Sequence, residues 1–218
     1  APTGAGKTDA SLLWASRQIA VHKADRLVIA MPTRFTANAL SVNVAATLSD
    51  TGLYHSSAWY SKYSKVQNGE LDMKEALAQQ KMANLLATPI TVCTIDHLLM
   101  SLTFTQESHH LICSNLANSC VVIDEADFYD DFTLANIIFL LKVLHNWKVP
   151  VMIMSASLPE SALQLYRKAG FNIESILEDK ESDSYNKCFN IKKLIEYDDI
   201  QDINYLLKYC IERGNAII

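Results

Sequence analysis

Paired cysteines are absent from this sequence of 218 residues. The five Cys residues are scattered singly, at positions 93, 113, 120, 188 and 210, and no two form a C-x-x-C pair. An odd, unclustered set argues against a disulfide framework and against a zinc site. We therefore expect reduced thiols in the core of a cytoplasmic protein.

Long apolar runs are lacking as well. The most apolar stretch, ANIIFLLKVL, is interrupted by Lys142, and it is far shorter than the roughly 18–20 residues of a membrane span. No signal-peptide pattern opens the chain. These absences predict a protein without a membrane partner.

Positive charge is not in excess, because 19 Lys and Arg residues face 24 Asp and Glu residues and the net charge is −5. Such a chain has no general attraction for nucleic acid. Any contact with DNA or RNA must come from local basic and N–H-rich loops, or from parts outside this sequence. Half of the residues are hydrophobic and 20% are charged, as in an ordinary globular enzyme.

The length allows one sizeable core and the start of a second domain. The chain begins inside a motif without an initiator Met, and it stops at GNAII, which reads as an interrupted strand. We expect it to be part of a longer polypeptide.

Four short runs are continuously apolar, as in strands that are buried on both faces of a parallel sheet: LVIAM (27–31), ITVC (90–93), CVVI (120–123) and VMIM (151–154). Helical stretches lie before and between them, over 7–20, 35–49, 72–87 and 130–146. This alternation predicts an α/β, doubly wound fold. In such sheets ligands bind at the carboxyl ends of the strands, where the polar motifs of this sequence fall.

The opening APTGAGKT fits a phosphate-loop pattern with Ala1 at the first glycine position. Small residues let successive backbone N–H groups surround a polyphosphate, and the following helix directs its positive end at the same anion. Lys7 would reach the β- and γ-phosphates and the Thr8 hydroxyl would ligate Mg²⁺. The predicted ATP-binding residues are Thr3, Gly4, Ala5, Gly6, Lys7 and Thr8.

The second motif, VVIDEAD, ends an apolar strand in two carboxylates. Asp124 would hold Mg²⁺ and Glu125 would orient and deprotonate the attacking water. An acidic helix N-terminus is the alternative for this pair. With Lys7 and Thr8 on the same predicted edge, the pattern favours hydrolysis of a nucleoside triphosphate, and we expect ATP as substrate with Mg²⁺ as cofactor.

Further polar groups follow other strands. Thr33, Arg34 and Thr94 would position a phosphodiester backbone without reading bases, and helix capping by Thr is the alternative. Ser155 and Ser157 are expected within reach of Asp127, where they would couple the nucleotide state to nucleic acid, again with capping as the alternative. The segment 53–65 interleaves aromatic and Lys residues, which suits single-stranded nucleic acid, or it is a strand followed by a surface turn. The adjacent His109 and His110 indicate a surface pair.

The motifs APTGAGKT, PTR, DEAD and SAS, in this order, resemble the first RecA-like domain of superfamily 2 helicases. Local details are similar to the signature helicase–nuclease of type I CRISPR interference over about residues 1–170. MPTRFTANAL resembles its LPTRATANAM-like segment, TVCTIDHLL its VGTIDQLL, DEADFYDDF its DEVHAYD, and SASLP its SATLP. Asp127 stands where that family usually has His, and Ser157 where it has Thr.

The resemblance implies a RecA-like, three-layer αβα domain with a mainly parallel sheet. It implies a first ATPase domain over 1–190 and, over 191–218, a linker helix with the first strand of the second RecA-like domain. It also implies an ATP-driven motor on single-stranded DNA that moves 3′ to 5′. The implied partners are a Cascade-type CRISPR surveillance complex, a second RecA-like domain and an HD nuclease outside this sequence.

Two other functions compete. The literal DEAD suggests a DEAD-box RNA helicase, but that group typically carries PTRELA, adjacent glycines and TPGR, whereas this chain has PTRFTA, no adjacent glycines and TIDHLL. A nucleotide-gated clamp without turnover would be expected to have lost Lys7 or Glu125, and both are present.

Overall fold

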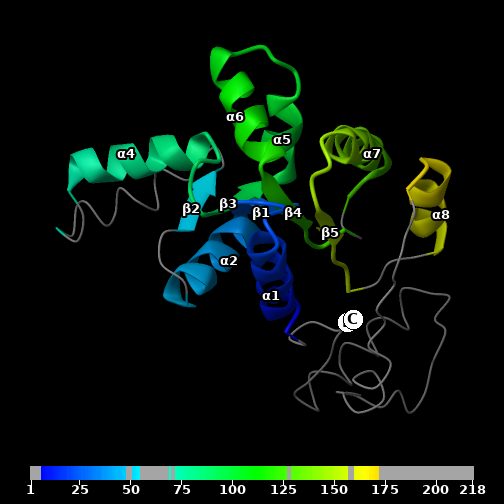
Figure 1. The fold of residues 1–218 in the computed structure, drawn as a ribbon, viewed down its shortest axis with the longest axis horizontal. Helices are drawn as coiled ribbons and strands as arrows, with labels where there is room; N and C mark the ends of the chain where they lie inside the picture. Colours follow the sequence, from blue (N-terminus) through cyan, green and yellow to red (C-terminus); the bar gives the residue numbers. More distant parts are fainter. Residues whose placement is uncertain are drawn as a thin grey trace, which may run out of the picture. The chain divides into compact units, whose positions relative to one another are not determined.

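The computed structural model describes residues 6–47, 51–54, 69, 72–126, 129–156 and 160–171. Five strands form one parallel sheet in the order β2-β3-β1-β4-β5 (Figure 1). They are β1 (Arg26–Met31), β2 (Thr51–Tyr54), β3 (Ile90–Thr94), β4 (Ser119–Ile123) and β5 (Val151–Ile153). Each central strand is almost entirely buried, which explains why its sequence is continuously apolar.

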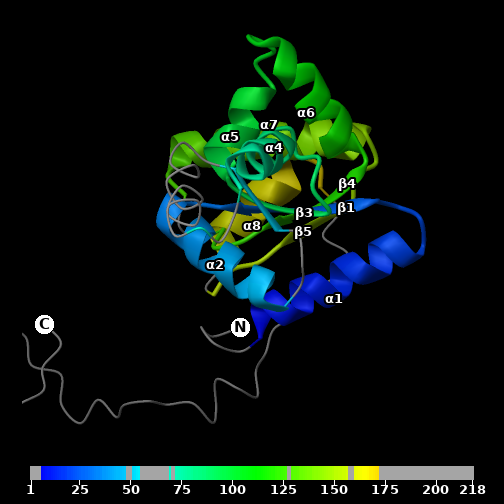
Figure 2. The ribbon, with the colours of Figure 1, turned by 90° about the vertical axis from the view of Figure 1, so that its left-hand side faces the viewer.

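Helices cover both faces of the sheet and produce three layers (Figures 1 and 2). On one face lie α1 (Lys7–Ala20) and α2 (Arg34–Thr47). On the other lie α5 (Ile95–Ser101), α6 (Glu107–Ala117), α7 (Asp131–Asn146) and α8 (Glu160–Lys168). The remaining described helix, α4 (Met73–Asn84), packs beside the edge strand β2. The observed architecture is the α/β, RecA-like three-layer fold that the sequence predicts.

Alternation along the strands builds a separate apolar cluster on each face. Leu27 and Ile29 of β1 pack with Ala15 of α1 and Ala37 of α2. Val28 and its neighbours on the opposite face pack with α5, α6, α7 and α8. In α7 one face is buried against the sheet, and its innermost side chains are Ile137, Leu140 and Leu144, each 0% exposed. The two apolar clusters hold the strands between the helices and so fix the positions of the strand ends.

The four apolar runs and the four helical stretches form in the described part of the chain, within a few residues at their ends. The four runs become β1, β3, β4 and β5, and the four helical stretches become α1, α2, α4 and α7. The sequence reading missed α5, α6 and α8. The strand that was the alternative for the segment 53–65 corresponds to β2, which begins two residues earlier. In β2 the four-residue segment TGLY includes Gly52, and α4 approaches that glycine closely, since an added Cβ would lie 2.9 Å from the Ala83 Cβ.

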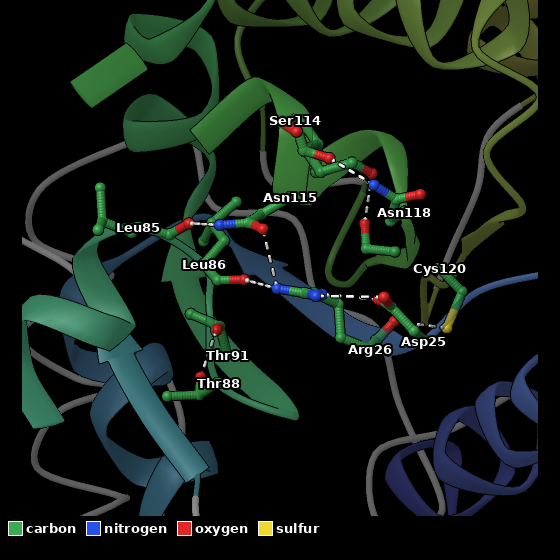
Figure 3. Close-up of polar contacts among 12 residues, drawn as sticks. Asp25, Arg26, Leu85, Leu86, Thr88, Thr91, Ser114, Asn115, Asn118 and Cys120 are labelled. Carbon is green, nitrogen blue, oxygen red and sulfur yellow. Dashed lines mark hydrogen bonds and ion pairs between the residues drawn. The ribbon is translucent and has the colours of Figure 1, made fainter. Parts of the chain in front are cut away.

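The amino edge of the sheet carries a polar network around Arg26 (Figure 3). Its Nε donates to Asp25 Oδ1 at 2.7 Å, and its Nη1 donates to the Leu86 carbonyl at 3.2 Å and to Asn115 Oδ1 at 3.1 Å. Asn115 Nδ2 in turn donates to the Leu85 carbonyl at 2.8 Å. One guanidinium therefore ties β1 to the turn after α4 and to α6.

Two expectations about side chains meet the structure with different results. Cys93, Cys113 and Cys120 are buried free thiols, as predicted, and burial raises the pKa of Cys120 to about 11. The prediction of a surface pair is correct for His110, which is exposed, and wrong for His109, which is only 4% exposed. Neighbouring helical residues point about 100° apart, so one of them faces the core.

No helix in the described part of the chain is long and apolar enough to cross a membrane. The proposed boundary at residue 190 and the segment 191–218 lie outside the described residues, as does 55–65 of the aromatic and basic segment.

Candidate active site

The predicted site residues that the structure describes lie at the carboxyl edge of the sheet. Because all five strands are parallel, the segments that follow β1, β3, β4 and β5 leave at the same edge. The chain passes from the end of α1 into β1 through residues 21–25 only, so α1 runs back beneath the sheet (Figure 2). The first turn of α1, with Lys7 and Thr8, therefore points toward the edge at which β4 ends in Asp124 and Glu125.

The start of α1 is shaped for an anion. Gly6 caps the helix in the left-handed conformation, with φ of 78°, and as a glycine it provides no side-chain cap for the first backbone N–H groups. A helix start of this kind presents N–H donors and positive partial charge to a ligand. Lys7 and Thr8 are half-buried. Thr3, Gly4 and Ala5 lie outside the described residues.

Asp124 is a buried carboxylate at the end of β4, with 7% of its surface exposed. Its backbone N–H donates to the Ala30 carbonyl at 3.0 Å, which extends the pairing with β1 by one residue. Its Oδ1 accepts the backbone N–H of Glu125 at 2.8 Å. The orientation of the carboxylate is therefore set by the backbone that follows it.

Glu125 adopts a strained backbone conformation, with φ of 53°. For a residue with a side chain, the left-handed region costs about 1–2 kcal/mol, and such residues cluster at functional sites. The strain persists because both neighbours are tied down: Asp124 to β1, and Ala126 by its N–H to the Met154 carbonyl at 3.0 Å. This turn aims Glu125 away from the direction in which the strand would have continued.

The residues after DEAD support this turn. The Tyr129 hydroxyl lies 3.5 Å from the Asp124 carbonyl, and burial, with the nearby carboxylates, raises the pKa of Tyr129. Asp130 caps α7, since its Oδ1 accepts the Thr133 N–H at 2.7 Å, and that bond lowers the pKa of Asp130. Asp127 lies outside the described residues.

Thr33 caps a helix, which was the alternative to its predicted contact with a phosphodiester backbone. Its hydroxyl oxygen accepts the Thr36 backbone N–H at 3.2 Å, and its carbonyl accepts the Ala37 N–H at 3.1 Å. Arg34, which begins α2, is exposed at the carboxyl edge. Helix capping and a nucleic-acid contact are compatible, because capping fixes the turn from which Arg34 projects.

Thr94 differs from Thr33. It is 3% exposed, and its side chain makes no capping hydrogen bond to the backbone of α5. Instead its Oγ1 lies 2.7 Å from Nδ1 of His97, whose ring also contacts the Tyr54 ring at a centroid distance of 4.7 Å. Sequence reasoning named Tyr54 only as part of the aromatic and basic segment 53–65 and missed His97. The three-residue spacing from Thr94 to His97 at a helix start was the signal for His97.

Ser155 follows β5, is half-buried and has an interaction partner. Ser157 lies outside the described residues, so the coupling trio of Asp127, Ser155 and Ser157 stays a prediction.

Within the described ranges, no three His, Cys, Asp or Glu residues come together in a way that could hold a metal ion. The residues present nevertheless fit Mg²⁺, which protein sites usually hold by one or two carboxylates together with waters and the phosphates of the substrate. Asp124 supplies a backbone-oriented carboxylate at the strand end, and Thr8 a hydroxyl in the first turn of α1.

A parallel sheet with a glycine-capped helix and two carboxylates at its carboxyl edge defines a nucleotide-binding motor domain. The DEAD/DEAH box helicase family matches residues 1–165. The chain therefore belongs to the DEAD/DEAH box helicases.

Within that class, the chain is similar to Cas3 proteins. The CRISPR-associated nuclease/helicase Cas3 relative in Methanocaldococcus jannaschii is 31% identical over 162 residues, which are 73% of this chain and 22% of the relative. The crystal structure of T. fusca Cas3-AMPPNP matches with a TM-score of 0.65 and 28% identity, over 78% of this chain and 20% of that one.

A chain in a CRISPR RNA-guided surveillance complex, in a pre-nicking state, matches with a TM-score of 0.52 and 27% identity, over 78% of this chain and 16% of the other. The chain thus spans about a fifth of the length of the relatives it matches.

Proposed function

We propose that this domain is the first of two RecA-like motor domains in a Cas3-type helicase of type I CRISPR defence. The observation that carries the proposal is the carboxyl edge, where a glycine-capped helix start and the strained Asp124–Glu125 turn face the same side of the sheet. Family membership and the likeness to a Cas3-AMPPNP structure support ATP as the nucleotide.

Each residue at this edge has a distinct task in ATP hydrolysis. The backbone N–H groups at the start of α1 bind the phosphates, and the Lys7 ammonium neutralises charge on the β- and γ-phosphates. Thr8 and Asp124 hold Mg²⁺, which when bound neutralises charge that develops on the phosphate oxygens. The Glu125 carboxylate orients the attacking water and accepts its proton. The left-handed turn at Glu125 supports this role, because it fixes the direction from which the side chain starts.

The nucleic acid follows the same edge further along the sheet. Thr33 and Arg34 lie at the end of β1, and we assign them to the sugar–phosphate backbone of single-stranded DNA. Thr94 lies at the end of β3, where the same DNA strand would pass, but its side chain is buried. Asp127, Ser155 and Ser157 carry the nucleotide state to that strand. Because the net charge is −5, the chain as a whole does not attract DNA, and binding depends on such local groups.

The partners follow from the relatives. A Cas3 nuclease/helicase and a chain in a CRISPR surveillance complex are the matched proteins, and both are far longer than this domain. We therefore assign to the intact protein a Cascade-type complex as recruiter, a second RecA-like domain, an HD nuclease and a cytoplasmic location. The RNA helicase alternative is not favoured, because the relatives that match this chain are Cas3 nuclease/helicases.

ATP hydrolysis by the intact protein tests the proposal. We expect single-stranded DNA to stimulate turnover strongly and RNA of the same length and sequence to have little effect. Stimulation by RNA alone would overturn the Cas3-type assignment and return the DEAD-box alternative. Lys7→Ala, which should lose ATP binding and turnover together, is the control that the measured hydrolysis comes from this domain.

A further inference from the structure

Three elements bring their polar side chains together at one end of the carboxyl edge. The end of β2 supplies Tyr54, the end of β3 supplies Thr94, and the first turn of α5 supplies His97. The parallel register pairs Tyr54 with Cys93, the residue before Thr94, which explains why Tyr54 reaches the same place. The start of α2 adds Arg34, close enough for its charge to act on His97.

Thr94 is poorly placed to touch a polymer. It is 3% exposed, and its hydroxyl is already 2.7 Å from His97 Nδ1. A phosphate needs a donor that solvent reaches, and burying a phosphate at Thr94 would require it to shed its water. His97, by contrast, is half-buried and lies in the first turn of α5.

The surroundings of His97 hold its ring in place. Thr94 fixes one nitrogen, and Tyr54 packs against the ring edge-to-face, at 4.7 Å and an interplanar angle of 63°. With Nδ1 held in this way, a ligand that approaches the ring meets Nε2. The imidazole has one N–H donor when neutral and two when protonated.

We propose that His97, held by Thr94 and Tyr54 beside Arg34, is the residue that contacts the DNA phosphate backbone at the end of β3, and that its protonation strengthens this contact. The inference rests on the proposed function, because it names a further residue of the same nucleic-acid edge. It reassigns to His97 a contact that the sequence pattern attributes to Thr94, which becomes a positioning residue.

The charges around His97 determine its pH range. Burial lowers its pKa below the usual 6.5; Asp96 on the same helix opposes this shift, and Arg34 from α2 adds to it. Tyr54 from β2 is the remaining titratable neighbour, and burial raises its pKa, so it stays neutral. His97 is therefore neutral in the free protein near pH 7. A bound phosphate supplies negative charge and raises its pKa, so binding and proton uptake are linked.

The test is the salt dependence of single-stranded DNA binding by the intact protein at pH 7.5 and pH 5.5. In the unaltered protein, we expect the slope of log Kobs against log salt to steepen by up to about one at pH 5.5, because one more cation meets the phosphates. Affinity should rise by up to about tenfold for each pKa unit that DNA binding adds to His97.

The variants separate this contact from simple packing. His97→Gln keeps a neutral donor and should abolish the pH-dependent part of the slope. Arg34→Ala should instead make the slope less steep by about one at both pH values. His97→Lys should make the slope steeper at both pH values, because the lysine charge does not titrate in this range. His110→Gln, at an exposed His on α6, is the matched control and should behave like the unaltered protein.

A slope in His97→Gln that still steepens at pH 5.5 would overturn the inference alone, even if its melting temperature falls, and so would a His97→Lys slope equal to that of the unaltered protein. Failure of the unaltered protein to bind single-stranded DNA at either pH would overturn the proposed function and this inference with it.

Discussion

The amino and carboxyl edges of the sheet use their polar groups in opposite ways. At the amino edge, the donors of Arg26 end on Asp25, Leu86 and Asn115, so the hydrogen bonds stay within the fold. At the carboxyl edge, α1 starts at Gly6 without a side-chain cap, and Glu125 has a left-handed backbone. One edge satisfies its charge internally, and its left-handed residue Leu86 (φ 54°) lies just past the end of α4, whereas the other keeps a buried acid and a left-handed Glu125 directly after a strand.

The difference separates the polar groups that stabilise this fold from those that are available to a ligand. A network of charge-assisted hydrogen bonds stabilises the loops that it joins, and removing its central group leaves buried partners unsatisfied. A left-handed residue just past a helix, such as Leu86, ends that helix. Strain directly after a strand, as at Glu125, and an uncapped helix start instead lower stability and are typical of functional sites. We therefore expect changes at the amino edge to alter folding and changes at the carboxyl edge to alter turnover.

The largest effect is expected at Glu125. Glu125→Gln should retain ATP binding and lose turnover by at least about 100-fold, because the amide does not accept the proton of the attacking water. Glu125→Gly should lose turnover equally, yet its unfolding free energy should not fall, since glycine adopts the left-handed conformation without strain. Measured kcat and denaturant unfolding check both. Retained turnover in either variant would remove Glu125 from its assigned role.

Arg26→Met tests the opposite edge. We expect a loss of about 1–3 kcal/mol in unfolding free energy, because the Leu86 carbonyl and Asn115 lose a charged partner. ATP turnover per folded molecule should be unchanged. Arg167→Met is the matched control: its partner Glu160 is 61% exposed, and the expected loss is at most about 1 kcal/mol. Equal losses in the two variants would show that the Arg26 network is no stronger than a surface pair.

A smaller effect is expected from Asp25. The hydrogen bond from Arg26 lowers its pKa below the usual 3.8. A carboxylate with a lowered folded-state pKa stabilises the fold above the unfolded value, and this contribution is lost as the pH falls below about 4. Asp25 is 59% exposed, so the contribution is at most about 1 kcal/mol. Unfolding of the unaltered protein and of Asp25→Asn between pH 5 and pH 3 should converge as the pH falls. Curves that stay parallel would contradict the assignment.

Much of this comparison could be predicted from the sequence. Apolar runs that are buried on both faces identify β1, β3, β4 and β5, and the motifs at their ends name Lys7, Asp124 and Glu125 because phosphate and proton chemistry restrict the residue types. The roles of these residues remain predictions, whereas their location at one edge follows from the parallel sheet.

The rest could not be predicted, for physical reasons. The contact between Tyr54 and His97 depends on the register of β2 against β3, which no periodicity in either segment reveals. The burial of Thr94 depends on how β3 pairs within the sheet, and the burial of His109 depends on which side of α6 faces the core. The strain at Glu125 comes from hydrogen bonds of its neighbours to two other strands, and it leaves no mark in the residue types.

The most direct measurement is a crystal structure of the intact protein with AMPPNP and Mg²⁺. The account predicts the γ-phosphate within about 3 Å of the Lys7 ammonium and the metal about 2.1 Å from the Thr8 hydroxyl, with the Glu125 carboxylate facing the same phosphate. A nucleotide bound elsewhere, or bound with Lys7 and Glu125 on opposite sides of it and out of reach, would contradict the account.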